Sequence, residues 1–366
     1  MLLDFFPSPT LTRYLVKTFV TRILAVLVML VLVLMMLDLL SQSGKILKHP
    51  GNGEAELLRY TMLRIPQLVA RFLPYSVLLA TIITLAGLNQ NSEVVAMKAA
   101  GMSAHQILAP LLLAAGAVSV LSFTFNEFVV TRATADLKAW EAVEYGPVPQ
   151  ESSTRSNVYF TAGDDILTAA TLTGSGAGTT MTGVTFYERD SHGMIRSLLR
   201  SERAVYAAPG WRLDRPRSFD VRTAQAGEAS GPVVVAPELT LDQVMLSRVD
   251  PDAESLVQLS RSIRALDDAG RRTAELKAKW WHKISGPLSA LLMPLLGAVA
   301  GFGLARSGQL FARAVIGMAL GFAYFVVDNA ALAMGSFGGY PPLLAAWAPF
   351  LLFLFVGETV LVRTEE

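Results

Sequence analysis

The chain has 366 residues, of which 52% are hydrophobic and only 17% charged, and its formal net charge is +1. Soluble domains carry about 25% charged residues, so this composition argues against an ordinary soluble enzyme. The near-neutral charge argues against nucleic-acid binding, and the lack of cysteine excludes disulfides, thiolate metal sites and cysteine nucleophiles.

The charged residues are concentrated in the middle of the chain. Of 61 in total, residues 1–127 hold 15, residues 128–282 hold 38, and residues 283–366 hold 8. Two apolar ends therefore flank a polar middle. This distribution predicts a membrane protein with a polar domain inserted between two membrane-embedded halves.

The first apolar run, Ile23 to Leu37, is extended by flanking apolar residues to about 19–40. It matches the roughly 20 residues that a spanning helix needs. It is too long for a signal peptide and lacks a small-residue cleavage site, so we expect a retained anchor. The whole chain predicts six membrane-spanning helices, at about 19–40, 66–88, 107–128, 284–304, 310–332 and 343–362.

Six spans place both termini on one side of the membrane. That side carries seven cations, and the short loops of the other side carry four, with Arg71 just inside the second span as a fifth. The positive-inside rule therefore favours cytoplasmic termini and an outer polar middle. The seven are Arg13, Lys17, Arg22, Lys98, Arg306, Arg313 and Arg363, and the four are Lys45, Lys48, Arg59 and Arg64.

Glycines four residues apart occur in the fourth and fifth spans, at Gly297/Gly301 and Gly317/Gly321. This spacing allows close helix packing, although glycine is common in membrane helices in any case.

The polar middle shows short alternating stretches separated by turn residues, which is typical of β-strands. Such stretches begin at Val158, Ile166, Val184 and Val233, and a hairpin around Pro209-Gly210 follows Ala204. They suggest a sandwich or a jellyroll. We divide the chain into an N-terminal membrane half (1–128), a β domain (129–250), a connecting helix (251–282) and a C-terminal membrane half (283–366).

The connecting helix is predicted from Leu256, Leu259, Ile263 and Leu266, whose spacing gives one apolar face. A basic stretch with Trp280, Trp281, His282 and Lys283 follows. Tryptophans beside cations mark the bilayer interface. They either anchor the fourth span only or also meet an anionic lipid head group.

The sequence has no enzyme constellation. It lacks a GxxxxGK[ST] phosphate loop and a GxSxG elbow, and its four histidines have no metal-ligand spacing. We therefore expect no catalytic residue, no metal and no cofactor in this chain. Any nucleotide-driven work must come from a partner.

The loop between the second and third spans predicts a short amphipathic helix. Ser92 could cap its N-terminus and Gly101 could end it. Val94 and Met97 would form an apolar strip with the polar Glu93 and Lys98 beside it. Such a helix could dock into a groove of a cytoplasmic motor domain, or merely link the two spans.

The stretch SEVVAMKAAGMS, from Ser92 to Ser103, resembles the loop motif of the LptF/LptG (YjgP/YjgQ) permease family. The resemblance extends over essentially the whole chain, as three spans, a polar domain and three spans. Several stretches are more similar to the G-type subunit than to its F-type paralogue, which stays the alternative. They are Leu37-Asp38, KAKWWHKISGPLS from Lys277, GFAYFVVDNA from Gly321 and GGYPP from Gly338.

The resemblance implies a membrane subunit of the lipopolysaccharide export ABC transporter in the Gram-negative inner membrane, with a periplasmic β-jellyroll. Its implied partners are an F-type permease, a homodimer of the LptB ATPase, which would bind ATP and Mg, and LptC, which passes lipopolysaccharide towards LptA. The helix at Ser92–Gly101 would be the coupling helix, and Glu93 would pair with a basic residue of the ATPase.

One departure from the family concerns the first span. Relatives often carry a lysine in its outer part, where this chain has Leu34-Met35-Met36 and then Ser41-Gln42. We expect interfacial cations to hold the lipid phosphates instead, since a cation at mid-bilayer costs roughly 2.5–3.5 kcal/mol. The candidates are Lys45, Lys48, Arg64, Arg71, Lys279 and Lys283; alternatively they are surface cations that snorkel.

Three polar residues fall inside predicted spans: Asp38, Asp328 and Asn329. An intramembrane carboxylate usually faces the bundle interior. We expect Asp328 to hydrogen-bond a neighbouring helix or the F-type subunit, or to take part in gating, and Glu127 to be interfacial. The rival functions are export of another lipid or lipoprotein and, since only Arg363 to Glu366 follow the last span, less well a membrane sensor.

Overall fold

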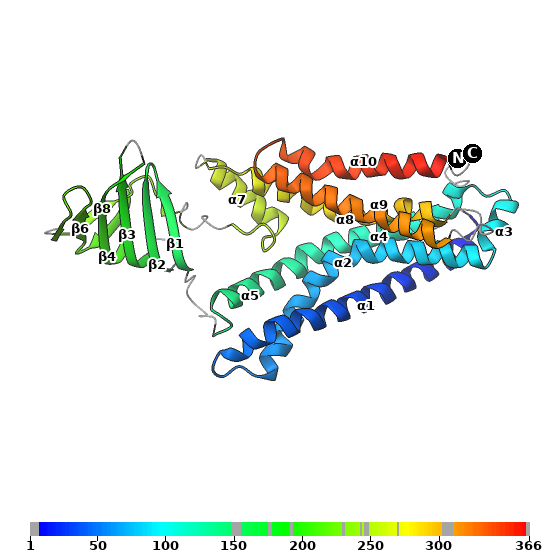
Figure 1. The fold of residues 1–366 in the computed structure, drawn as a ribbon, viewed down its shortest axis with the longest axis horizontal. Helices are drawn as coiled ribbons and strands as arrows, with labels where there is room; N and C mark the ends of the chain where they lie inside the picture. The colour runs from blue at the N-terminus through cyan, green and yellow to red at the C-terminus, as the bar shows by residue number, and fades with distance from the viewer. Residues whose placement is uncertain are drawn as a thin grey trace. The chain divides into compact units, whose positions relative to one another are not determined.

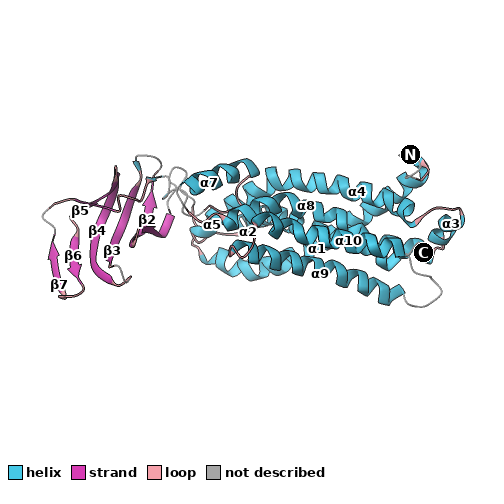
Figure 2. Cartoon of the chain, turned by 90° about the horizontal axis from the view of Figure 1, so that it is seen from above, coloured by secondary structure: helices cyan, strands magenta, loops and turns pink. Residues whose placement is uncertain are grey.

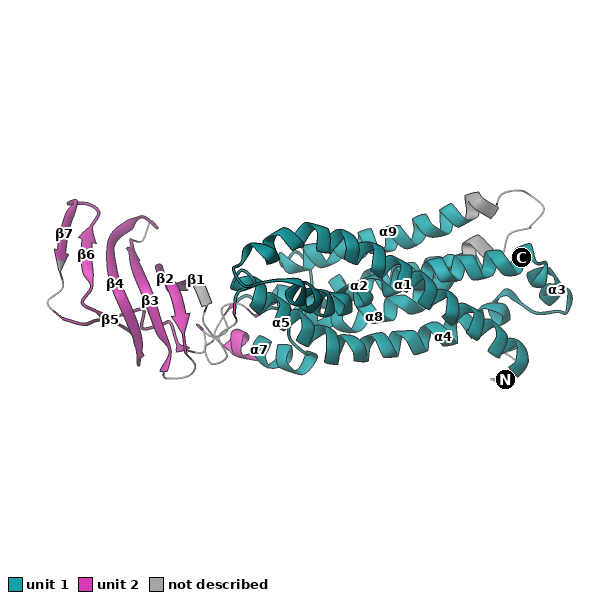
Figure 3. Cartoon of the chain, turned by 90° about the horizontal axis from the view of Figure 1, so that it is seen from below, with its two compact units in different colours: residues 1–146, 250–263, 272–366 teal, residues 147–249, 264–271 magenta. Residues whose placement is uncertain are grey.

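The computed structural model describes residues 7–147, 155–174, 178–190, 193–228, 231–241, 244, 249–268, 271–301 and 310–363. The chain forms two compact units (Figure 3). The helical unit comprises Met1–Gly146, Asp250–Ile263 and Arg272–Glu366, and the β unit comprises Pro147–Val249 and Arg264–Arg271. Figure 2 distinguishes the strands from the helices by colour, and Figure 3 shows that the strands belong to the β unit. The predicted boundary at 128 is therefore too early, because helix continues through the polar residues that follow the third apolar run.

The helices, in chain order, are α1 (Pro9–Lys48), α2 (Glu54–Gln90), α3 (Glu93–Ala99), α4 (Ala104–Phe125), the π-helix η1 (Asn126–Val130), α5 (Thr131–Ala142), α7 (Leu256–Asp268), α8 (Ala274–Gly301), α9 (Leu310–Ser336) and α10 (Pro342–Arg363). Figure 1 shows α3 and both chain termini at one end of the helical unit and α5 at the other.

Five helices are long and apolar enough to cross a membrane: α1, α2, the continuous Ala104–Ala142 rod of α4, η1 and α5, the Ala314–Ser336 part of α9, and α10. Within the described residues α8 is not among them, so five of the six predicted spans have a candidate helix. The end of the predicted fourth span, with Arg306, lies outside the described residues, as does the side chain of Arg313.

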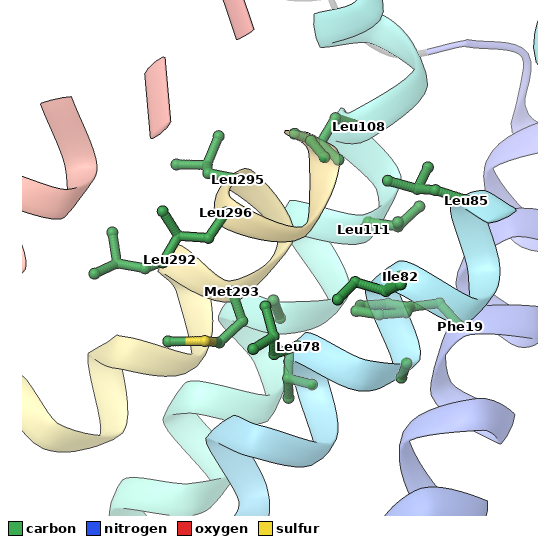
Figure 4. Close-up of a cluster of buried hydrophobic side chains, with 14 of the residues drawn as sticks. Phe19, Leu78, Ile82, Leu85, Leu108, Leu111, Leu292, Met293, Leu295 and Leu296 are labelled. Atoms are coloured by element: carbon green, nitrogen blue, oxygen red, sulfur yellow. The ribbon is translucent and has the colours of Figure 1, made fainter. Parts of the chain in front are cut away.

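The spanning helices and α8 pack around one apolar core, part of which is shown in Figure 4. Phe19, Leu85, Leu111 and Leu292 are fully buried there. Gly321 allows a close helix approach, since a Cβ on it would lie 2.2 Å from Leu78 Cδ2. Gly297 does the same for Thr81, whose Cγ2 would be 2.7 Å away. Small residues at these crossings fit close helix packing, whereas the surroundings of Gly301 lie outside the described residues.

The β unit contains one antiparallel sheet. Its strands are β1 (Arg155–Ala162), β2 (Asp165–Thr173), β3 (Thr180–Arg189), β4 (Ile195–Ala207), β5 (Gly210–Asp214), β6 (Arg217–Asp220), β7 (Gln225–Glu228) and β8 (Val233–Val235). The order is β1-β2-β3-β4-β5-β8, with β6 between β4 and β7. All the predicted strand stretches are found, and the predicted hairpin joins β4 to β5 through Ala208-Pro209.

Strand β4 changes partner along its length. Its first half pairs with β6 and its second half with β5. Ser201 is buried at this junction, where its hydroxyl donates to the Asp214 carbonyl at 2.6 Å. One face of the sheet packs on an apolar core that contains the fully buried Trp211. The Trp211 Nε1 donates a hydrogen bond to the Leu239 carbonyl at 3.1 Å.

The predicted amphipathic helix is α7, which starts at Leu256 as expected. The predicted connecting segment nevertheless ends too late, because residues from Ala274 onward already belong to α8. The Trp280-Trp281 pair therefore lies on the first turns of α8 rather than before it.

Candidate functional site

A cavity of about 530 Å³ lies at the end of the helical unit away from α3, between α2, the α4–α5 rod, α8 and α9. We call it the polar pocket, because charged and polar side chains from all these helices converge on it. They are Gln67, Arg71, Ser122, Asn126, Thr134, Lys138, Asp252, Lys279, His282, Lys283, Ser289, Asp328 and Asn329. Of the residues predicted from the sequence, it brings together Arg71, Lys279, Lys283, Asp328 and Asn329.

The four Lys and Arg side chains of the pocket divide into two that form ion pairs with aspartates and two that do not. Lys138 forms an ion pair with Asp250, and Lys279 Nζ lies 3.7 Å from Asp252 Oδ1. Arg71 and Lys283, by contrast, have no ion-pair partner among the described residues. The pocket therefore contains two positive groups without a direct ion-pair partner, although the carboxylates of Glu127, Asp250, Asp252 and Glu254 lie near Lys283. An ionised donor binds an anionic ligand about twice as strongly as a neutral one.

Asp328 lies in the wall of the polar pocket and is 5% exposed. Its Oδ2 is 3.0 Å from His282 Nε2, which belongs to α8. Its Oδ1 is buried and has no hydrogen-bond partner among the described residues. Neighbouring Asn329 instead donates to the Phe325 carbonyl of its own helix at 2.7 Å. A carboxylate is costly in this environment, and the His282 ring is the group that compensates for it.

An aromatic stack contacts both the polar pocket and the apolar core. Tyr75 of α2 and Phe325 of α9 are stacked with their ring centroids 3.8 Å apart. Both rings line the polar pocket and also pack into the apolar core cluster. These two rings therefore provide one point of contact between the charged and the apolar parts of the bundle.

The predicted ring of lipid-binding cations is divided among three places. Lys45 and Lys48 line a second cavity of about 600 Å³ together with Glu141 and Glu144. Arg64 lines neither of these two cavities. It forms an ion pair instead, with its Nε 3.0 Å from Asp38 Oδ2. Tyr60 donates to the same oxygen at 2.7 Å. Asp38, predicted as an intramembrane polar group, is thus held by two side chains of α2.

Glu127 holds the start of α7 in place. The N–H of Leu256 donates to both of its carboxylate oxygens, at 2.7 and 3.0 Å. Glu127 belongs to η1, and π-helical turns of this kind often occur at functional sites. The expectation that Glu127 is simply interfacial is incomplete, since sequence spacing could not show a contact 129 residues away.

The Ser255-x-x-Gln258 pair caps α7 reciprocally. The Ser255 N–H donates to Gln258 Oε1 at 3.1 Å, and the Gln258 N–H donates to Ser255 Oγ at 3.3 Å. This capping-box pattern is readable from the sequence and would have given the start of the helix. Trp280 fastens the same turn, since its Nε1 donates to Ser260 Oγ at 2.8 Å. This α8 residue therefore packs against α7.

Glu254 lies beside this turn and accepts a hydrogen bond from Ser262 Oγ at 2.9 Å. Burial raises the pKa of the Glu254 carboxyl above its ordinary value, although that hydrogen bond opposes the shift. The segment just before α7 thus includes a carboxylate whose charged form is disfavoured by burial.

Helix α3 is the predicted short helix, but two details differ. Ser92 has φ 61° and its side chain makes no capping hydrogen bond, so it ends the preceding turn instead of capping α3. Val94 and Met97 are buried in the bundle core, because the helix lies against α2 and α4. The predicted apolar strip is therefore not available to a partner.

The outer face of α3 is formed by other residues. Val95, which is 55% exposed, lies there with Ala96, Lys98 and Ala99. Glu93 accepts a hydrogen bond from Tyr14 at 3.3 Å. Gly101 has φ 86° and ends the helix as predicted, with the Met102 N–H bonded to the Met97 carbonyl.

Sequence reasoning missed Lys138, Asp250 and Asp252, and it placed His282 in the basic stretch beside the tryptophans without predicting its contact with Asp328. No local pattern marks them, because their partners come from distant segments. Among the described residues no group of three His, Asp or Glu side chains is arranged to hold a metal ion.

The comparisons with known proteins agree with this architecture. The sequence profile of the family "Lipopolysaccharide export system permease LptF/LptG" matches residues 13–363. The chain is 26% identical to the lipopolysaccharide export system permease protein LptG of Escherichia coli K12, over 98% of this chain and 99% of that protein. It is 25% identical to the LptG of Haemophilus influenzae, with the same coverage. The profile covers most of the chain, including the long-helix bundle and the inserted antiparallel β unit, so the chain belongs to the LptF/LptG family of lipopolysaccharide export permeases.

Proposed function

We propose that the chain is the G-type permease subunit of a lipopolysaccharide exporter in a Gram-negative inner membrane. Its termini and α3 face the cytoplasm, its β unit is a periplasmic jellyroll, and α8 is the sixth span. The full-length similarity to two LptG proteins supports this assignment. The F-type paralogue and an exporter of another lipid or lipoprotein are the alternatives.

The polar pocket carries the proposal for substrate binding. Arg71 and Lys283 present two positive groups without a direct ion-pair partner among the described residues, in the same pocket as the stacked Tyr75 and Phe325. Phosphates of a lipid head group can form charge-assisted hydrogen bonds with them, while acyl chains stay beside the apolar helices. Lys279 contributes once its partner Asp252 is displaced, whereas Lys45 and Lys48 form a separate contact point.

The energy for lipid export comes from partner proteins. We propose an F-type permease, an LptB-type ATPase homodimer that binds ATP and Mg, and LptC. Helix α3 lies at the same end as both termini, as expected for a coupling helix (Figure 1). Its Val95–Ala99 face and Glu93 would contact the ATPase. Closure of the ATPase would then bring the two permeases together and expel the lipid.

Substitution of the two open cations tests the substrate site. Arg71→Ala with Lys283→Ala should weaken lipopolysaccharide binding to the purified complex at least about tenfold, since each hydrogen bond to a charged group contributes about 1.5–3 kcal/mol. Arg132→Ala is the matched control, because Arg132 is an exposed α5 cation that does not line the polar pocket. Equal binding by the double variant and the control would exclude this site.

Coupling is tested at α3. Val95→Asp places a charge on the outer face of the helix and should abolish lipid release while the membrane subunits still assemble. Val95→Thr has nearly the same shape and is expected to retain most activity. Glu93→Ala should weaken ATPase assembly or uncouple hydrolysis from export. Unchanged lipid release by both the Val95→Asp and Glu93→Ala complexes would contradict the coupling role.

A further inference from the structure

Two of the four cations in the polar pocket already have an anion beside them. The carboxylates of Asp250 and Asp252 lie against Lys138 and Lys279, respectively. Both acids come from one short loop before α7, and they are separated by a single residue, Pro251. The loop thus places two negative groups where an anionic ligand would place its own.

This loop contains a tight turn and is held by hydrogen bonds at its α7 end. Asp250 Oδ1 accepts from the Asp252 N–H at 3.1 Å, which closes a tight turn. Beyond the turn, the Ser255–Gln258 cap and the Glu127 carboxylate hold the first residues of α7. The carboxylates remain partly in water, with side-chain exposures of 32% for Asp250 and 60% for Asp252. They can therefore leave the lysines without unfolding the loop.

We propose that Asp250 and Asp252 are internal competitors for a second anionic group of the bound lipid, at a subsite formed by Lys138 and Lys279. This inference rests on the proposed function. The first phosphate of the lipid binds the open Arg71 and Lys283, and the second displaces the two carboxylates. A phosphate monoester carries a charge of about −1.5 to −2, so it presents each lysine with more negative charge than the single carboxylate beside that lysine.

The competition explains how a strongly basic pocket could still release its ligand. A site on a transport path must bind well enough to load and weakly enough to let go. The returning carboxylates lower the affinity for the leaving phosphate and neutralise the lysines after its departure. The open cations therefore govern capture, and the paired cations govern release.

The test uses the complete transporter complex in phosphatidylcholine nanodiscs. The variant is Asp250→Asn with Asp252→Asn, because Asn retains the acceptor oxygen that closes the turn. Two probes with identical acyl chains are titrated, a glucosamine-disaccharide lipid with two phosphates and the same lipid with one. Glu275→Gln is the control, since Glu275 is an exposed acid of α8 without an ion-pair partner among the described residues.

The double variant should bind the two-phosphate probe about fivefold more tightly and release it about fivefold more slowly, the order expected when two exposed ion pairs stop competing. Its affinity for the one-phosphate probe should change by less than about twofold. Asp252→Asn alone, at the more exposed position, should give a smaller gain of the same sign. The Glu275→Gln complex should match the unmodified one with both probes.

Equal gains with both probes would overturn the inference, because they would show only a general change of charge. Unchanged or weaker binding of the two-phosphate probe would overturn it as well. The double variant Arg71→Ala with Lys283→Ala distinguishes a failure of the competitor role from a failure of substrate binding in the polar pocket. If that variant weakens both probes while the Asp variants gain nothing, substrate binding in the polar pocket stands and only the competitor role falls.

Discussion

The apolar core and the polar pocket are built by the same helices, yet they differ completely in chemistry. On α2, Leu78 in the core and Arg71 in the pocket are seven residues apart, which is two turns, or about 10 Å. On α9, Gly321 contacts Leu78, and Asp328 lines the pocket seven residues further on. One face of each helix therefore passes from tight packing to charge within two turns.

The difference between the two regions is one of charge, since neutral atoms without a partner, such as Thr84 Oγ1 and Trp347 Nε1, also occur outside the pocket. The core closes around small residues. The pocket holds, among the described residues, two cations without an ion-pair partner and a buried carboxylate oxygen without a hydrogen-bond partner. Such groups cost stability and persist where a ligand can compensate for them. Stability and ligand binding should therefore respond to different substitutions.

The largest effect is expected in the core. Leu292 is fully buried, so Leu292→Ala should lower the free energy of unfolding by about 2–5 kcal/mol through lost contacts and a cavity. Denaturation of the purified complex by SDS in mixed micelles measures this. Leu351→Ala is the matched control, because Leu351 is 45% exposed on α10. A core variant as stable as the control would show that this packing is not what holds the bundle together.

Asp328→Ala tests how much the polar pocket contributes to stability. It removes the partner of His282 and should cost about 1–3 kcal/mol, measured by the same denaturation. Asp328→Asn retains a hydrogen-bonding group for the ring and should cost less. Equal losses in the two variants would mean that the negative charge itself, not the hydrogen bond, stabilises the α8–α9 contact.

Glu127→Ala should fray the start of α7 without disturbing the core. The loss of an N-terminal cap is expected to cost about 0.5–2 kcal/mol. Hydrogen exchange at the Leu256 amide, followed by mass spectrometry, should accelerate, while exchange in the middle of α2 stays unchanged. Glu127→Gln retains one acceptor and should show a smaller change. Unaltered protection at Leu256 would contradict the capping role.

The smallest effect is a pH dependence at Glu254. Its pKa is raised in the folded protein, so the protonated form is the one that folding favours. This contribution is fully present below the unfolded pKa and is lost as pH rises through the folded value. Glu254→Gln should therefore be more stable than the unmodified chain at neutral pH and should lose that advantage in acid. Melting temperatures that differ by the same amount at pH 4 and pH 7 would disprove this.

Local patterns predicted the helices and strands well, because they are set by apolar runs and by alternation. The strands of the β unit, α7 and the helix at Glu93–Ala99 all follow such patterns. The continuation of the third span through η1 and α5 was missed, since its polar residues resemble a linker. The orientation of α3 was also missed, because spacing gives an apolar face but not the neighbour that covers it.

The site was predictable only in part. Arg71, Lys279 and Lys283 could be selected as interfacial cations from their place in the chain. Whether each is open or paired depends on Asp250, Asp252 and Asp38, which reach them from distant segments. Arg64 shows this best, since it has the same sequence setting as Arg71 but is neutralised by Asp38.

The central claim is that the lipid head group binds in the polar pocket at Arg71 and Lys283. A photoreactive amino acid at Ala70, which lines the pocket, tests this directly when lipopolysaccharide is crosslinked in the assembled transporter. The same probe at Leu121, 68% exposed on α4, is the reference. We predict a strong crosslink at Ala70 that Arg71→Ala with Lys283→Ala abolishes and the Arg132→Ala control preserves. A crosslink at Ala70 no stronger than at Leu121, or one that survives loss of both cations, would contradict the account.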